Sequence, residues 1–217
     1  MHIHNLSDKA SILNQYLLEI RDETIQKDTM RFRRNLERIG NILGYELSKS
    51  LEYKNQPITT PLEETSAKKL SESLVICSVL RAGLPLHQGL LQVFDRSENA
   101  FISAFRHPAE NERGFEIITD YVATPNLEGK TLILADPMLA TGDSLVATYN
   151  SLLRFGIPKQ VHVVCVIGSS YGVDHINSTL PDASHLWIAD VDPQLNDKSY
   201  IIPGLGDAGD LAFGSKL

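Results

Sequence analysis

The sequence predicts an α/β protein with an open, mainly parallel sheet flanked by helices. From Leu74 onward, short apolar runs alternate with segments of helical periodicity. The apolar runs lack polar alternation, which is typical of strands buried on both faces, and helices between such strands form the crossovers of a parallel sheet. The predicted strands are LVICSVL, TLILA, VHVVCVIG and HLWIAD, and the helices between them are GLPLHQGLLQVF, DSLVATYNSLLRFG and YGVDHINSTL.

Length and composition indicate one domain over residues 1–217. A chain of 217 residues with 42% hydrophobic residues can bury a core without disulfides or a structural metal. No linker rich in Pro, Gly or Ser divides the chain. We expect a core over about residues 70–190, preceded by an N-terminal helical segment over about residues 9–50.

The N-terminal segment carries the pattern of an amphipathic helix between Asp22 and Ser50. Apolar residues recur there at steps of three and four, with charged residues on the opposite side. The apolar positions are Phe32, Leu36, Ile39, Leu43 and Leu47, and the charged ones are Arg31, Arg34, Glu37 and Arg38. The stretch from Tyr53 to Pro61 contains two prolines and Ile-Thr-Thr, so it is expected to be extended or a hairpin.

Two further strands are predicted between the first two strand and helix units. They span Ala100 to Phe105 and Phe115 to Val122, and the polar segment RHPAENERG joins them. A loop with so many charges is expected to be mobile and exposed to solvent.

Charge and cysteine content narrow the setting in which the protein acts. A formal net charge of −7 argues against non-specific binding to nucleic acid, because that requires a surplus of Lys and Arg on the contacting face. No window reaches the ~20 apolar residues of a membrane span, and the start lacks the apolar core of a signal peptide. Cys77 and Cys165 lie far apart within apolar runs, as buried thiols do. We therefore expect a cytoplasmic protein.

Residues 131–148, TLILADPMLATGDSLVAT, carry the strongest chemical signal. They read as a strand that ends at Asp136, a short turn, and a helix that opens at Ala-Thr-Gly-Asp-Ser. Backbone N–H groups from Ala140 to Ser144 and the positive end of the helix suit a phosphate, and Gly142 allows close approach. The Asp136 carboxylate suits sugar hydroxyls. The pattern indicates a phosphorylated sugar, although a capped helix without a ligand is the alternative from spacing alone.

Gly168-Ser-Ser170-Tyr-Gly172 offers a rival from another enzyme class. It follows an apolar strand and precedes a helix, as the nucleophile elbow of a serine hydrolase does, with Asp174 or Asp182 and then His185 downstream. That reading leaves the segment 131–148 without a role.

The Asp-Pro-Met-Leu-Ala-Thr-Gly run resembles the signature for phosphoribosyl pyrophosphate (PRPP) in the uracil phosphoribosyltransferases. Three other segments are similar to that family in the same order: IRDETIQKDTMRFRR, VLRAGLPLHQGL and YIIPGLGDAGDLAFGSK. The resemblance implies a type I phosphoribosyltransferase-like fold, with a small C-terminal hood over about residues 191–217 that covers the base. It also implies transfer of phosphoribosyl from PRPP to N1 of uracil, giving UMP and pyrophosphate.

The resemblance assigns site residues as well. Arg81, Arg106 and Asp207 match catalytic positions, and an arginine fork suits pyrophosphate oxygens. The implied PRPP-binding residues are Arg81, Arg106, Asp136, Pro137, Met138, Leu139, Ala140, Thr141, Gly142, Asp143, Ser144 and Asp207. The implied uracil-binding residues are Ile201, Gly206, Asp207 and Ala208.

Two positions depart from the family pattern. Pro137 stands where many phosphoribosyltransferases have a second acid after Asp136. The implied cofactor, Mg²⁺, would thus be held mainly by PRPP, with Asp207 as the candidate protein ligand. Asp143 replaces a second glycine, and its side chain is expected to point away from the phosphate, because a carboxylate in the first helical turn favours the helix dipole.

Several expectations about partners remain open. The family resemblance implies a homo-oligomer, a dimer or larger, and a GTP effector, since some members have both. The arginines at 31, 33, 34 and 38 fit a solvated helix face or such a contact. The histidines do not follow metal-ligand spacing, and His2 and His4 lie at a terminus expected to fray. A non-catalytic PRPP-binding regulator that contacts RNA is the further alternative, although only this helix is basic.

Overall fold

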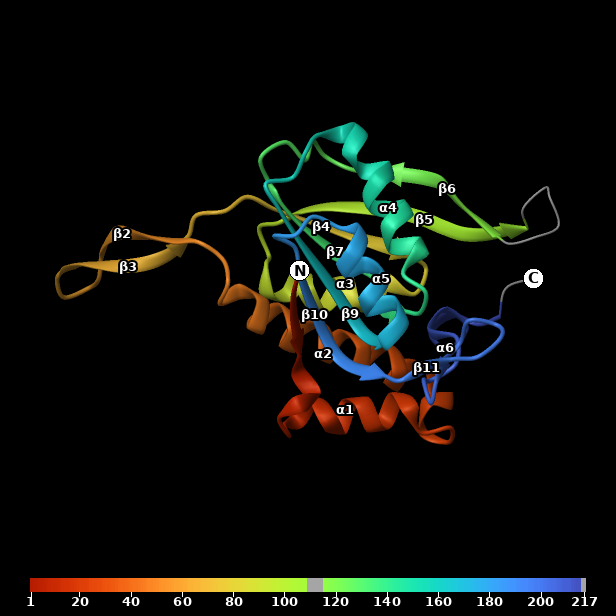
Figure 1. Ribbon diagram of the computed structural model, residues 1–217. Coiled ribbons are helices and arrows are strands. Elements are labelled where there is room, and N and C mark those ends of the chain that lie inside the picture. Colours follow the sequence, from red (N-terminus) through yellow and green to blue (C-terminus); the bar gives the residue numbers. More distant parts are fainter. Residues whose placement is uncertain (109–114, 216–217) are drawn as a thin grey trace.

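A sheet of eight strands forms the centre of the molecule (Figure 1). The computed structural model describes the backbone of residues 1–108 and 115–215, and the side chains of residues 1–103 and 121–215. The strand order is β1 (His2–Asn5), β10 (His185–Asp192), β9 (Gln160–Ser169), β7 (Thr131–Ala135), β4 (Leu74–Leu80), β5 (Glu98–Pro108) and β6 (Phe115–Ala123), and the short β8 (Met138–Leu139) also pairs with β9. Among the described strands of this sheet, only β5 and β6 pair in antiparallel fashion. The expectation of a mainly parallel sheet is confirmed.

Helices cover both faces of this sheet. One face packs on α1 (Ile12–Arg21), α2 (Thr29–Ser48) and α3 (Gly83–Val93), and the other on α4 (Asp143–Leu152) and α5 (Ser170–Thr179). Successive residues of β7 alternate between the two cores, so that Ile133 belongs to the first and Leu132 and Leu134 to the second. A strand buried on both faces has to be apolar throughout, which explains the uninterrupted runs in the sequence.

The amphipathic helix expected between residues 22 and 50 is α2. Its five apolar positions at steps of three and four are all buried. Asp28 caps the helix, because its side chain accepts a hydrogen bond from the Arg31 N–H at 3.0 Å. The apolar side of α2 thus supplies much of the core beneath the sheet.

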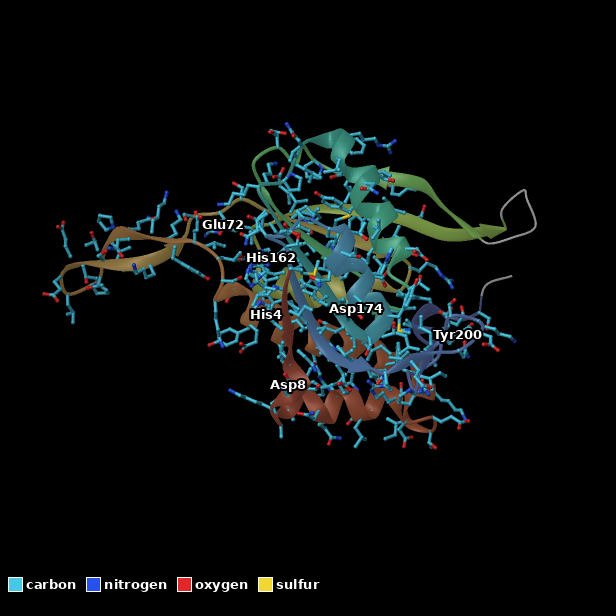
Figure 2. The ribbon with its side chains drawn as sticks, viewed as in Figure 1. His4, Asp8, Glu72, His162, Asp174 and Tyr200 are labelled. Atoms are coloured by element: carbon cyan, nitrogen blue, oxygen red, sulfur yellow. The ribbon has the colours of Figure 1, made fainter. Side chains whose placement is uncertain are left out.

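A hairpin of β2 (Tyr53–Thr59) and β3 (Glu64–Leu70) extends from the body as an exposed ribbon (Figure 1). This is the hairpin alternative expected for the stretch from Tyr53. Glu72, labelled at the base of the ribbon in Figure 2, is buried and accepts a hydrogen bond from the Glu52 N–H at 2.7 Å. Its carboxylate also contacts the Thr131 hydroxyl, so a buried acid ties the ribbon to the sheet.

The first residues are not frayed, contrary to the expectation for His2 and His4. They form β1, which pairs in parallel with β10 and extends the sheet. The ring of His4 stacks on Trp187 with 3.8 Å between centroids, and its Nε2 lies 3.1 Å from Nδ1 of His185. Pairing to a neighbouring strand and ring stacking hold this end of the chain in place.

The remaining elements are short. The chain beyond β10 forms β11 (Gln194–Leu195), β12 (Ile201–Ile202) and α6 (Ala208–Phe213), and three 3-10 turns span Leu6–Asp8, Ile25–Lys27 and Leu153–Phe155. We call residues 193–215 the hood. The predicted mobile loop RHPAENERG lies largely outside the described residues. Among the described residues, no helix combines the length and apolar character needed to cross a bilayer.

Candidate active site

The sheet places two loops side by side at the carboxyl ends of its central strands. β4 pairs with β5 on one side and with β7 on the other, so the chain changes direction across the sheet at β4. In open α/β sheets, ligands bind beyond the carboxyl ends of the strands at such a point. The loops that follow β4 and β7 carry Arg81 and Asp136.

A cavity of about 710 Å³ opens between these loops and the hood. Its walls are formed by Val79, Leu80, Arg81, Ala82, Asp136, Met138, Ala140, Thr141, Gly142, Ser144, Leu145, Lys198, Ser199, Tyr200, Ile201, Gly206, Asp207, Ala208 and Gly209. The volume suits a ligand of the size of a nucleotide. The hood end of the wall is marked by Tyr200 in Figure 2.

The wall on the β7 side ends at the N-terminus of α4. Gly142 precedes the helix with φ of +87°, a conformation that favours glycine. A Cβ on Gly142 would lie 3.0 Å from Cδ2 of His175 and from Cγ2 of Ile176. The close approach expected for this glycine is therefore made to α5 behind the loop. Ser169 adds to this support, because its hydroxyl donates to the Ala140 carbonyl at 2.6 Å.

Asp136 lies half-buried on the same wall. Its Oδ1 accepts a hydrogen bond from the Met138 N–H at 3.2 Å. Burial raises the pKa of Asp136 to about 7, although this hydrogen bond acts in the opposite direction. Close to neutral pH, the carboxyl group therefore divides between its protonated and ionised forms.

Arg81 reaches from the β4 loop to the C-terminal end of the hood. Its Nη2 donates to the Gly214 carbonyl at 3.0 Å and lies 3.6 Å from Oδ1 of Asp210. The guanidinium remains partly open to solvent, since 41% of the side chain is exposed. The arginine thus has a fork at the cavity and a contact with the hood.

The hood turn on the opposite wall is held by one asparagine. Oδ1 of Asn196 accepts hydrogen bonds from the backbone N–H groups of Lys198 at 3.0 Å and Tyr200 at 2.9 Å. Ser199, between them, has φ of +60°, in the left-handed region. A non-glycine residue there is costly unless its surroundings hold it, and local strain of this kind gathers at ligand sites.

The Asp207 side chain has two roles in the structure. It lines the cavity, and its Oδ1 accepts a hydrogen bond from the Asp210 N–H at 2.9 Å as the N-cap of α6. The expectation assigned this carboxylate to ligands alone. One oxygen belongs to the helix cap, which leaves Oδ2 for a ligand.

The structure separates the predicted residues into those on the cavity wall and those behind it. On the wall are Arg81, Asp136, Met138, Ala140, Thr141, Gly142, Ser144, Ile201, Gly206, Asp207 and Ala208. Pro137 and Leu139 are buried behind it, and the Pro137 carbonyl accepts from the Val166 and Ile167 N–H groups. The Asp143 carboxylate lies 3.4 Å from Nε2 of His175, so it points toward α5. Arg106 belongs to β5, but its side chain lies outside the described residues.

A sequence model described as uracil phosphoribosyltransferase matches residues 7–215. The chain belongs to the uracil phosphoribosyltransferase family. The uracil phosphoribosyltransferase of Porphyromonas gingivalis is 46% identical over 217 residues, with 100% of both chains covered. That of Pyrococcus furiosus is 39% identical over 207 residues, covering 93% of this chain and 88% of the relative.

Solved structures agree with this membership. The AQ2163 protein from Aquifex aeolicus superposes with a TM-score of 0.87 at 29% identity and covers 99% of each chain. A hypoxanthine phosphoribosyltransferase from Staphylococcus aureus has a TM-score of 0.50 at 14% identity, covering 75% of this chain and 76% of its own. The second match shows the shared type I phosphoribosyltransferase fold alone.

The serine hydrolase alternative is wrong for this phosphoribosyltransferase fold. Ser170 lies at the carboxyl end of β9, where Ser169 is in register with Asp192. His185 pairs with His162 at the other end of the same strands. Seven residues of β10 separate these levels, about 23 Å at ~3.3 Å per residue. Asp174 is exposed on α5 (Figure 2), and the three groups do not form a triad.

The cavity wall also contains residues that were not predicted. Lys198, Ser199 and Tyr200 line the cavity just before Ile201. Tyr200 begins the C-terminal segment that resembles the family, which is the one sequence signal that marks this wall. Lys198 and Ser199 carry no such signal, because only the turn held by Asn196 brings them to the cavity.

Proposed function

We propose that this member of the uracil phosphoribosyltransferase family transfers the phosphoribosyl group of PRPP to N1 of uracil in the described cavity. UMP and pyrophosphate are the products. The observation that carries the proposal is the composition of the cavity wall: a helix N-terminus, the half-buried Asp136 and Arg81 face a glycine-rich hood. Membership of the family supports the reaction, and the chemistry of the wall supports a location for each part of both substrates.

The loop before α4 suits the 5′-phosphate of PRPP. The first turn of a helix has backbone N–H groups without intrahelical partners and carries partial positive charge. Thr141 and Ser144 add hydroxyl donors on the cavity wall. Asp143 faces His175, so its charge is directed away from the phosphate. The proposed phosphate contacts are therefore the loop backbone and these two hydroxyls.

The ribose and the pyrophosphate take the neighbouring parts of the wall. Asp136 in its ionised form accepts hydrogen bonds from two ribose hydroxyls. Arg81 offers a planar fork to the pyrophosphate, which gains negative charge as its bond to C1′ loosens. Arg106 remains a predicted second arginine for this group. In this scheme the protein holds substrates in line and places cations, and it supplies no nucleophile.

Uracil fits the hood side of the cavity. It presents carbonyl acceptors and an N3–H donor along one edge, and backbone groups around Gly206 and Ala208 complement such an edge. Ile201 supplies a buried apolar contact. Cytosine carries an amino group in place of one carbonyl and would leave buried groups unpaired, so discrimination of about 10⁴-fold is expected.

The donor set fits a magnesium ion bound mainly by substrate. Among the described residues, no group of three or more His, Cys, Asp or Glu side chains is arranged to hold a metal ion. Mg²⁺ commonly binds phosphate oxygens and water with one or two carboxylates, and it neutralises charge on a leaving pyrophosphate. Asp207, through Oδ2, and Asp136 are the side chains that would hold it. We expect Asp207→Asn to alter the dependence of the rate on magnesium, and an unchanged dependence would exclude a metal-linked role.

A homo-oligomer in the cytoplasm completes the proposal. An isolated two-stranded ribbon is marginally stable in water, so the exposed ribbon of β2 and β3 favours contact with another copy. Both cysteines are free and buried, which fits a reducing compartment. The helix arginines each have an intramolecular partner: Arg31 with Glu19, Arg33 with Ala212, Arg34 with Glu37, and Arg38 with Asn35. A GTP effector therefore stays a prediction without a contact that supports it.

The decisive experiment uses the full chain with PRPP, magnesium and a panel of nucleobases, and it follows release of pyrophosphate. Release with uracil alone is expected. Comparable turnover of cytosine or hypoxanthine would contradict the assignment of the hood. No release with any base, together with measurable PRPP binding, would favour the regulator alternative. Arg81→Gln should lose most of the activity, and Arg34→Gln, on the exposed side of α2, is the matched control.

A further inference from the structure

A half-buried arginine, Arg21, connects the N-terminal helices to the hood. Arg21 is the last residue of α1, and Figure 1 shows this end of α1 on the same side of the molecule as β11 and α6. Its Nη1 donates to Oδ2 of Asp192 at 2.8 Å and its Nη2 to Oδ1 of Asp192 at 3.0 Å. Nη2 also donates to Oδ2 of Asp190 at 2.8 Å. Both aspartates lie near the end of β10, directly before the hood.

Arg21 and Asp192 also form hydrogen bonds with the backbone carbonyl and N–H of Gly204 in the hood. Nη1 of Arg21 donates to the carbonyl of Gly204 at 3.0 Å, and the N–H of Gly204 donates to Oδ2 of Asp192 at 3.0 Å. Gly204 has φ of +63°, and a Cβ there would lie 2.1 Å from the carbonyl oxygen of Ile201. The chain therefore turns sharply at this residue, and the turn is fixed from outside by two charged side chains.

Gly204 lies between the two hood segments that line the cavity. Ile201 precedes it by three residues, and Gly206 to Ala208 follow it directly. A shift of the Gly204 peptide would move both segments. The loop before α4 on the opposite wall is instead supported by α5, through Gly142 and Ser169. The side-chain supports of the two walls therefore differ, although the Ser170 hydroxyl of α5 also donates to the Asp192 carbonyl at 3.4 Å.

We propose that Arg21 and Asp192 are positioning residues for uracil: they set the hood turn at Gly204, so that the base-facing residues meet uracil, while the loop before α4 keeps its own support. The inference rests on the proposed function, because it takes the hood as the uracil side of the cavity. Neither side chain lines the cavity, so neither acts on substrate directly.

The electrostatics of the pair favour a fixed geometry. Only 19% of the Arg21 side chain and 7% of the Asp192 side chain are exposed. Burial lowers the pKa of Arg21, but its hydrogen bonds and charge pairs with Asp192 and Asp190 outweigh burial and raise that pKa above the ordinary value. The arginine therefore stays charged, and a charged fork with two bonds to one carboxylate has little freedom of orientation.

Asp190 provides a matched control on the same arginine. It pairs with Arg21, but its other partners are the Ser7 hydroxyl at 2.7 Å and the Val191 N–H. It has no hydrogen bond to the hood turn, and 31% of its side chain is exposed. Asp190→Asn and Asp192→Asn each remove one of the two carboxylate charges beside Arg21. Of the two, Asp192→Asn is the one that weakens the hydrogen bond to the Gly204 N–H.

The test compares kinetics of the full-length wild type, Asp192→Asn and Asp190→Asn with PRPP and uracil. Asp192→Asn should raise KM for uracil about tenfold, the scale of one lost charge-assisted hydrogen bond. Its KM for PRPP should rise less, by no more than about threefold, because Asp207 alone among the predicted PRPP-binding residues lies in the hood. Asp190→Asn should change both constants by about twofold or less. A purely structural role would lower active protein, and thus kcat, in both variants without this split.

Two results would overturn the proposal. One is an equal rise in KM for uracil in both variants. The other is a rise in KM for PRPP in Asp192→Asn that is as large as its rise in KM for uracil. If Asp192→Asn does not fold, Arg21→Lys decides, because lysine keeps the charge and lacks the fork. It should raise KM for uracil about threefold, with a smaller rise in KM for PRPP, and an unchanged KM for uracil would refute the role. Absence of uracil turnover in the wild type would instead refute the proposed function and, with it, this inference.

Discussion

Asp136 connects the chemistry of the cavity to the stability of the fold. Its pKa is about 7 in the folded chain against an ordinary value of 3.8. Between these pH values the folded state retains a proton that the unfolded state has released. The contribution of this group to folding stability therefore falls as the pH rises through this window and stays low above it. The full difference corresponds to about 4 kcal/mol, at about 1.4 kcal/mol for each pKa unit.

Asp136→Asn removes the charge and keeps an oxygen that can accept from the Met138 N–H. Above pH 7, we expect the free energy of unfolding of the variant to be higher than that of the parent. The gain should be about 2 kcal/mol, half of the full difference, because one side of the group faces the open cavity where water screens its charge. The gain should shrink as the pH falls toward the ordinary pKa of an aspartate.

The measurement is urea unfolding of both chains at several values between about pH 5 and pH 8, at one protein concentration. Asp174→Asn, at an exposed position of α5, controls for loss of a carboxylate elsewhere. A difference between Asp136→Asn and the parent that is the same at every pH, within about 0.5 kcal/mol, would refute the reasoning. So would a variant less stable than the parent at the highest pH.

Three other predictions test the surroundings of the site. Asp143→Gly should change KM for PRPP only a few-fold, because Asp143 contacts His175, and a large gain in affinity for PRPP would contradict this orientation. Gly142→Ala should lower the free energy of unfolding by about 1–3 kcal/mol, since φ is positive and its Cβ would lie 3.0 Å from His175; unchanged urea unfolding would show that the loop relaxes. Burial raises the pKa of Cys77 to about 12 and that of Cys165 well above its ordinary value. An aromatic disulfide reagent should therefore label neither thiol until urea unfolds the chain. Rapid labelling of the native protein would show that the core opens.

The local sequence pattern was sufficient to predict those features that lie within a single helix or strand or in one short stretch of the chain. The buried strands, the amphipathic α2 and the strand, turn and helix around Asp136 each follow from the order of residues along a short stretch, because side-chain direction repeats with the period of the element. The same reasoning was misleading for Ser170 and His185. Each residue fits its local role in a hydrolase, yet the parallel register of β9 and β10 places the two at opposite ends of these neighbouring strands.

In the site as well, some features follow from the local sequence and others depend on the tertiary structure. The positions that follow from family resemblance are mostly on the cavity wall, but resemblance to a motif does not say which members of a run face inward. Pro137 and Leu139 belong to the run and are buried behind the wall. The Asp207 carboxylate divides between a helix cap and the cavity, which depends on how α6 begins.

By itself, the sequence determined the class of fold, the order of the main strands and helices from Leu74 to Asp190, the family, and the segment at 131–148 that suits a phosphate. These follow from spacing within single elements and from contiguous motifs. Only the tertiary structure decided that Arg21 meets Asp192, 171 positions away, and that together they hold Gly204. Such contacts depend on strand register and on helix packing across the whole core, and neither leaves a periodic pattern in the chain.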